Sequence, residues 1–201
     1  AETLPGQGGE NQVFVDMARG YLKTICDGLT YINKKPTFKR LYFYFSNRTL
    51  LAVESLTAYL KAHNRETEVD RILSSAKTLE DRLDNLRALY MAEEKRPPEM
   101  EGVLGLADFD EVQFRKMTQS VWQVLGTLTR GVLGEKLSPE ETVSGRLSMF
   151  YDTRKIMERR SVLYVGLDAM ADPGLARSLG SMLLSDLTAA AGARYDFEAA
   201  S

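Results

Sequence analysis

One short apolar segment, residues 161–168, constrains the fold more than any other part of the chain. It reads Ser-Val-Leu-Tyr-Val-Gly-Leu-Asp, with Arg159 and Arg160 before it and Pro173 shortly after it. Apolar runs of this length, rich in β-branched and aromatic residues, are typical of a strand buried on both faces. A helical pattern follows over residues 173–191. A strand that leads directly into a helix is a unit of a parallel α/β sheet.

The rest of the chain shows mainly helical patterns. Apolar residues at spacings of three and four predict helices over residues 11–33, 49–63, 66–94, 108–134 and 152–160, a further helix starting at Ser138, and a loop over 99–107. The pentad Leu41–Phe45 favours a strand by propensity, but Pro36 and Thr37 make an acceptable helix start, so we expect a short helix over 38–47. The predicted fold class is mainly α, a helical bundle with one strand–helix unit.

The predicted strand has no expected partner in this chain, which indicates a piece of a larger protein. Composition fits a soluble domain, with 201 residues, 44% hydrophobic residues and a net charge of −2. The single cysteine, Cys26, excludes a disulfide scaffold and favours a cytosolic setting. Nothing in the sequence brings the only histidine, His63, near Cys26, so we read the thiol as a small apolar group. No apolar run approaches the ~18 residues that a membrane helix needs.

The motifs for catalysis and metal binding are incomplete. Gly6–Asn11 is rich in glycine but lacks the Lys-Ser/Thr pair of a phosphate loop, and Asp168 ends an apolar run as in a Walker B motif but is followed by Ala169. Asp108 and Asp110 allow a magnesium-dependent helical enzyme as an alternative, although both are placed to cap a helix. We therefore expect no catalytic residue, no metal ligand and no cofactor in this piece, and no enzyme activity of its own.

A basic and aromatic region offers a candidate binding surface. Residues 28–53 contain no acid, and their bases alternate with Tyr31, Phe38 and the run 42–44. Basic residues suit a nucleic-acid backbone, and aromatic rings suit unstacked bases. The candidate DNA-binding residues are Lys34, Lys35, Lys39, Arg40 and Arg48, with a weaker second cluster at Arg154, Lys155, Arg159 and Arg160. The alternative is that the aromatic residues form core while the bases lie on a solvated turn.

Two segments carry a family resemblance. Residues 160–170, with Gly180-Ser181-Met182, 185–187 and 190–192 behind them, resemble the TraD-like conjugative coupling proteins of plasmids and integrative elements. Residues 11–19 are similar to the segment that precedes the all-α domain of those proteins. The resemblance is best over 160–195 and fair over 10–45. Between these parts, only the helical pattern matches.

The resemblance implies a place in a larger machine. Those proteins are hexameric P-loop ATPases of the RecA type, anchored on the cytoplasmic side of the bacterial inner membrane, with an all-α domain inserted in the nucleotide-binding domain. Residues 1–47 would then be the entry segment that flanks the nucleotide-binding domain, and residues 48–158 would form the all-α domain. Residues 159–201 would be a strand and helix that belong to the nucleotide-binding domain again. The phosphate loop, the Walker B pair and the membrane helices are missing, so ATP and magnesium are expected only in the parent protein.

The function implied is substrate recognition in type IV secretion. This cytoplasmic domain would engage the relaxase, other relaxosome proteins or DNA, as a hexamer in the parent and as a possible monomer alone, without membrane contact. The alternative is a free-standing helical adaptor that binds a partner protein and no DNA.

Overall fold

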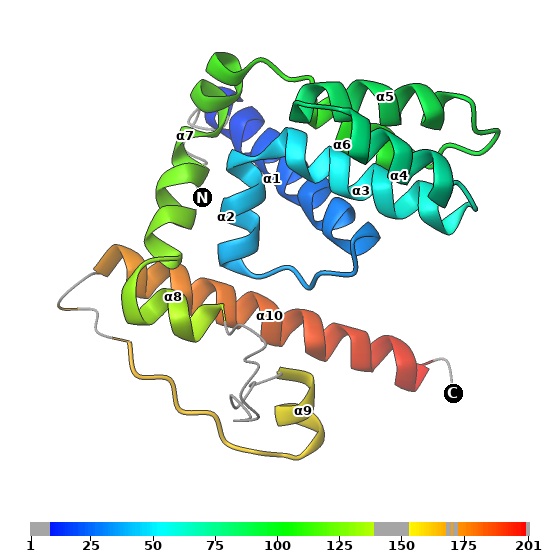
Figure 1. The fold of residues 1–201 in the computed structure, drawn as a ribbon. Coiled ribbons are helices and arrows are strands. Elements are labelled where there is room, and N and C mark those ends of the chain that lie inside the picture. The colour runs from blue at the N-terminus through cyan, green and yellow to red at the C-terminus, as the bar shows by residue number, and fades with distance from the viewer. Residues whose placement is uncertain (1–8, 139–152, 168–169, 171–172, 200–201) are drawn as a thin grey trace. The chain divides into compact units, whose positions relative to one another are not determined.

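The computed structural model describes residues 9–138, 153–167, 170 and 173–199. The chain separates into two compact units, Ala1–Glu141 and Thr142–Ser201, which are described one at a time. The first unit contains α1 (Gly9–Tyr31), α2 (Phe38–Ser46), α3 (Arg48–Ala62), α4 (Glu66–Ser75), α5 (Leu79–Met91), α6 (Pro98–Ala107), α7 (Glu111–Leu128) and α8 (Gly131–Leu137). The second contains α9 (Thr153–Glu158) and α10 (Pro173–Ala199) (Figure 1). The prediction of a mainly α fold is confirmed.

Helix α3 is the centre of the first unit, because it packs against α1, α2, α4, α5 and α6. Its residues Leu51, Leu56 and Leu60 are fully buried. Helix α1 crosses it closely at Gly28, where a Cβ atom would lie 2.9 Å from Leu51 Cδ1. The buried hydroxyl of Ser55 donates a hydrogen bond to the Gly28 carbonyl at 3.2 Å. Glycine therefore permits the approach of the two helices at this point.

The segment 38–47, for which propensity and start signals disagreed, is the helix α2. Thr37 has extended backbone angles, and its hydroxyl accepts a hydrogen bond from the Arg40 N–H at 3.3 Å. Phe45 is buried against Phe114 and Trp122 of α7, with ring centroids 4.9 and 5.2 Å away. The helix prediction is confirmed, and α2 packs on α7, α1 and α3.

The single long helix predicted over 66–94 is wrong, because the structure has α4 and α5 separated by residues 76–78. Thr78 begins α5 with a capping box, in which its hydroxyl accepts from the Asp81 N–H and the Asp81 carboxylate accepts from the Thr78 N–H. This cap satisfies N–H groups that a continuous helix would have bonded internally. The near-heptad pattern is shared by two helices that pack on α3.

The loop predicted over 99–107 is also wrong, because these residues belong to α6. Pro98 stands in the first turn, where its missing N–H costs nothing, and Glu99 and Glu101 favour the positive end of the helix. Met100 and Val103 are buried against the core, and α6 packs on α1 and α3. Burial of this apolar face stabilises the short helix.

Helix α7 begins after Asp110, one of the two acids predicted to cap a helix. The Asp110 carboxylate accepts a hydrogen bond from the Gln113 N–H at 2.8 Å. The helix ends at Leu128, before the glycines that were expected to end it, and Gly131, with a φ of +56°, opens α8 instead. The helix start predicted from Ser138 falls on residues 139–141, which lie outside the described residues.

The second unit corrects the strand prediction. Helix α10 confirms the helix expected from residue 173 and continues to Ala199. Residues 161–167 have no regular secondary structure and form a loop between α9 and α10 (Figure 1). Val162 is 97% exposed and Tyr164 is 91% exposed, so the segment is not a strand buried on both faces. A strand needs hydrogen bonds from a neighbouring backbone, and none is described for residues 162–167.

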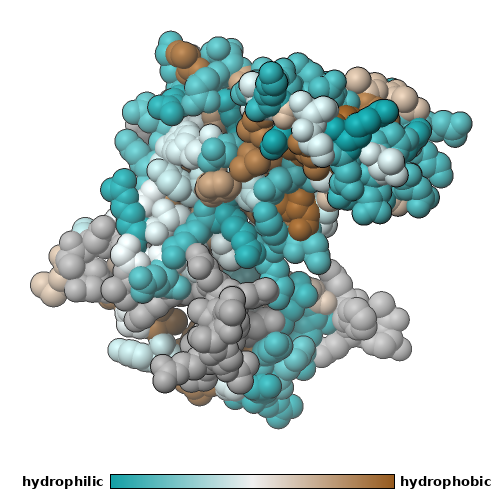
Figure 2. Space-filling model, viewed as in Figure 1, coloured by the Kyte–Doolittle hydropathy of each residue, from teal (hydrophilic) through white to brown (hydrophobic). Residues whose placement is uncertain are grey.

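The buried apolar cluster belongs to the first unit, with described members between Ile25 and Leu125. Helices α1 and α2, which fall in the predicted leading segment 1–47, pack into this core together with α3 and α7. The boundaries at residues 47 and 158 stay predictions. Among the described residues, no helix is long and apolar enough to cross a membrane. Figure 2 shows a mostly hydrophilic face over this unit, with small apolar areas between hydrophilic side chains.

Candidate nucleic-acid interface

The first predicted base, Lys34, is held in a contact between the α1–α2 connection and α3. Its ammonium group donates to the Tyr44 hydroxyl at 2.7 Å and to the Glu54 carboxylate at 3.0 Å, and the Tyr44 hydroxyl donates to the same carboxylate. The hydrogen bond to Tyr44 raises the pKa of Lys34, and burial raises the pKa of Tyr44. Both groups therefore keep their protons at neutral pH, and the charge of Lys34 is matched internally.

Two further bases also make contacts within the unit. The guanidinium of Arg40 donates to the Lys35 carbonyl at 2.9 Å and so ties α2 to the preceding loop. The side chain of Arg48 is only 7% exposed, pairs with Glu111 at 2.6 Å, and lies over the Phe114 ring at 4.0 Å. A buried, paired guanidinium is poorly placed to reach a phosphate, so the structure gives Arg48 no support as a DNA contact, and that assignment stays a prediction.

Lys39 is better placed for a ligand. Its backbone N–H donates to the Ser138 hydroxyl at 3.0 Å, and within the described residues its ammonium group has no ion pair. One turn further along α2, Tyr42 is half-buried and Phe43 is 49% exposed. Lys35 is exposed. The surface part of the predicted patch is thus centred on one face of α2.

The other aromatic residues of the predicted patch lie in the core or pack against it, as in the alternative interpretation of the patch. Tyr44 is buried, and Tyr31 packs edge-on against Tyr59 with ring centroids 6.1 Å apart. Phe38 is partly buried against the core. Tyr31, Phe38 and Tyr42 are half-buried, and Phe43 is the exposed ring among them.

The second basic cluster lies in the other unit. Arg154 and Lys155 belong to α9, and Arg159 and Arg160 follow it. All four are exposed. Because the two units are not placed relative to each other, this cluster is a separate candidate surface.

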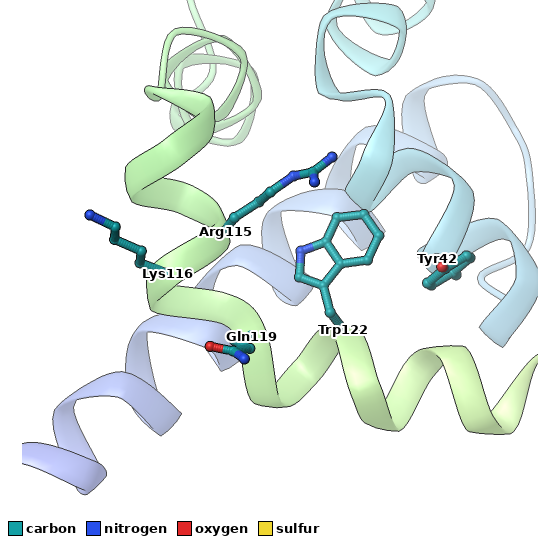
Figure 3. A pocket seen from close by; sticks show the side chains of 5 residues that line it. All are labelled: Tyr42, Arg115, Lys116, Gln119 and Trp122. Atoms are coloured by element: carbon teal, nitrogen blue, oxygen red, sulfur yellow. The ribbon is translucent and has the colours of Figure 1, made fainter.

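A pocket between α2 and α7 is lined by α7 residues that the sequence analysis did not select. It has a volume of about 540 Å³ and is lined by Tyr42, Arg115, Lys116, Gln119 and Trp122. Figure 3 shows Arg115 reaching from α7 towards the indole of Trp122, with Tyr42 of α2 on the other side of that ring. The spacing 115, 116, 119 and 122 places these α7 residues on one helix face, and this spacing was the signal available in the sequence.

The pocket is basic and aromatic. The rings of Tyr42 and Trp122 meet nearly at right angles, with centroids 5.3 Å apart and an interplanar angle of 81°. The Arg115 guanidinium lies 5.9 Å from the centre of the indole and pairs with Glu111 at 2.8 Å. No carboxylate is among the lining residues that the structure describes. An anionic ligand with a flat ring would match this lining.

The predicted alternative of a magnesium site was based on Asp108 and Asp110. The structure uses Asp110 as the cap of α7 and pairs Asp108 with Arg87 at 2.6 Å. In the described part of the chain, no three His, Cys, Asp or Glu residues are grouped to hold a metal ion. Cys26 is half-buried, and burial raises the pKa of its thiol, which favours the unreactive protonated form.

No known family model, curated protein or solved structure matches the chain.

Proposed function

We propose that the chain is the DNA-recognition part of a conjugative coupling ATPase and that its first unit binds DNA through α2 and α7. The observation that carries the proposal is the basic and aromatic lining of the α2–α7 pocket, where Tyr42 meets Arg115 and Lys116. Half-buried Lys39 and exposed Phe43 add to it on α2. Lysine and arginine at such a surface release counterions from the phosphate backbone on binding. The resemblance of residues 160–195 to TraD-like proteins supports the conjugative setting.

The second unit fits the same proposal. Its segment 161–167 exposes apolar side chains and has no regular secondary structure. In the parent hexamer, this segment would pair with the β-sheet of the ATP-binding core, which supplies the missing backbone partner. Relaxase, ATP and magnesium would then be bound by or near the parent protein in the cytoplasm.

The test is the salt dependence of DNA binding, measured by fluorescence anisotropy with labelled single-stranded and duplex oligonucleotides between about 50 and 200 mM salt. Lys39→Gln and Lys116→Gln should each weaken binding and lower the slope of log K against log salt by about 1. Lys77→Gln is the control, because Lys77 is exposed, as Lys116 is, but lies between α4 and α5. Affinity unchanged by both Lys39→Gln and Lys116→Gln would refute the proposed surface.

The runner-up function is a helical adaptor that binds a protein and no DNA. The exposed apolar side chains of Val162, Tyr164 and Leu184 in the second unit favour it. This reading predicts that neither oligonucleotide binds at about 50 mM salt, where electrostatic binding is strongest. It also predicts that Val162→Ser and Tyr164→Ser reduce self-association or retention on an apolar matrix. Neither variant should bind DNA.

A further inference from the structure

We propose that the pocket between α2 and α7 receives an unpaired base of single-stranded DNA, with Arg115 and Lys116 at the adjoining phosphates. The inference rests on the proposed DNA binding, and it adds the form of DNA and the atoms that select it. The lining combines two aromatic rings, two cations and one amide in about 540 Å³, which lies within the range of small-ligand pockets.

The two rings provide a stacking corner. Tyr42 and Trp122 are nearly perpendicular, so a base that stacks on one ring meets the other at its edge. Behind them, Phe45 packs against Trp122 at 5.2 Å and is itself buried, which fixes the indole in place. Bases of every type have an aromatic face, so this contact would be tolerant of sequence. A base in duplex DNA is stacked and paired, and it cannot enter such a corner without being flipped out.

Arg115 can move to a phosphate at small cost. Its side chain is 69% exposed, and its pairing with Glu111 therefore contributes little to stability. Glu111 has a second partner, the buried guanidinium of Arg48 at 2.6 Å, so its charge stays matched when Arg115 leaves. Lys116 and Gln119 are exposed beside it on the same helix, where the amide can bond to the edge of a base.

The indole of Trp122 has an unfilled hydrogen-bonding capacity. Its Nε1 is buried and has no partner among the described residues. A buried N–H without an acceptor costs free energy. Once Arg115 shifts, an oxygen or nitrogen atom of a base or phosphate would accept a hydrogen bond from this N–H. This donor and the released guanidinium would act on the same ligand.

The chain contains one tryptophan, so its fluorescence reports on this pocket alone. The probes are an oligothymidine, an abasic oligonucleotide of the same length and a duplex of the same length, titrated into the full chain at low salt. We expect the oligothymidine to quench Trp122 and to bind at least about five-fold more tightly than the abasic strand, as one stacked base would give. We expect the duplex to bind without quenching.

Three variants locate the effect. Tyr42→Leu should lower oligothymidine affinity about five-fold or more while leaving abasic affinity unchanged, because only stacking is lost. Arg115→Gln should weaken both strands and lower the salt slope by about 0.7, because one phosphate contact is lost. Gln123→Ala, on an exposed position of α7 outside the lining, is the control and should change neither. Circular dichroism checks that Tyr42→Leu remains folded. If it does not, the comparison of the oligothymidine with the abasic strand on the unchanged chain still tests the pocket.

The outcomes separate this inference from the proposed function. If single-stranded and abasic DNA bind equally and Trp122 is not quenched, the base pocket is refuted while DNA binding by the α2–α7 surface stands. If no oligonucleotide binds at all, both are refuted. Equal quenching by the duplex would also overturn the preference for a single strand.

Discussion

Arg48 shows at the scale of one residue how a predicted surface charge became part of the core. It stands at the start of α3, where its guanidinium is covered by the Phe114 ring and paired with Glu111. One of its nitrogen atoms, Nη1, is buried without a hydrogen-bond partner among the described residues. The single carboxylate of Glu111 therefore carries most of the compensation for a buried charge.

This arrangement predicts an asymmetry between the two partners. Glu111→Gln should lower the free energy of unfolding by about 1–3 kcal/mol, because it leaves the buried charge of Arg48 without a carboxylate. Arg48→Met should cost less, because it removes the charge and keeps an apolar chain on Phe114. Urea unfolding measures both. Arg115→Gln is the control and should stay within about 1 kcal/mol, as expected for an exposed pair. A Glu111→Gln loss no larger than this control would contradict the assignment.

At the scale of elements, α1 and α3 approach each other closely at Gly28. Gly20 and Gly28 both lie in α1, but a Cβ at Gly20 would meet nothing within 4 Å, whereas one at Gly28 would lie 2.9 Å from Leu51. Gly20→Ala should raise the free energy of unfolding by about 0.5–1 kcal/mol, since alanine favours the helix. Gly28→Ala has the same local gain, but it should lose about 1–3 kcal/mol to overpacking against a buried leucine.

The two glycines are matched controls for each other in thermal or urea unfolding. If both substitutions stabilise the protein equally, the close approach at Gly28 is not present in solution. If Gly28→Ala alone destabilises it, the double variant with Leu51→Ala should lose less stability than the sum of the two single losses, because the smaller side chain makes room for the new methyl group.

At the scale of the whole molecule, the buried apolar cluster that the structure describes lies in the first unit. Its described members all lie between Ile25 and Leu125, and the unit boundary falls at Glu141. Residues 1–141 alone should therefore unfold cooperatively. Leu56→Ala, at a fully buried position of α3, should cost about 2–5 kcal/mol both in this piece and in the full chain. Circular dichroism and Trp122 fluorescence follow the transition. A non-cooperative transition for residues 1–141 would show that the core needs the second unit.

The sequence by itself determined most helices. The spacing of apolar residues placed α1, α3, α7 and α10, and local caps placed the starts of α2 at Thr37 and α7 at Asp110. These signals are local, because a helix bonds each residue to one four positions away. The break between α4 and α5 was also encoded locally at Thr78, but the continuous apolar pattern outweighed it in the prediction.

Tertiary structure decided which side chains are available for binding. Lys34 and Arg48 look alike in sequence to Lys39, yet their partners Glu54 and Glu111 lie 20 and 63 positions away. The pocket joins Tyr42 to Trp122, which come from different helices. Among the described residues, no backbone hydrogen bond holds residues 162–167 as a strand. Burial, charge pairing and strand formation depend on contacts between distant parts of a chain, so local spacing could not fix them.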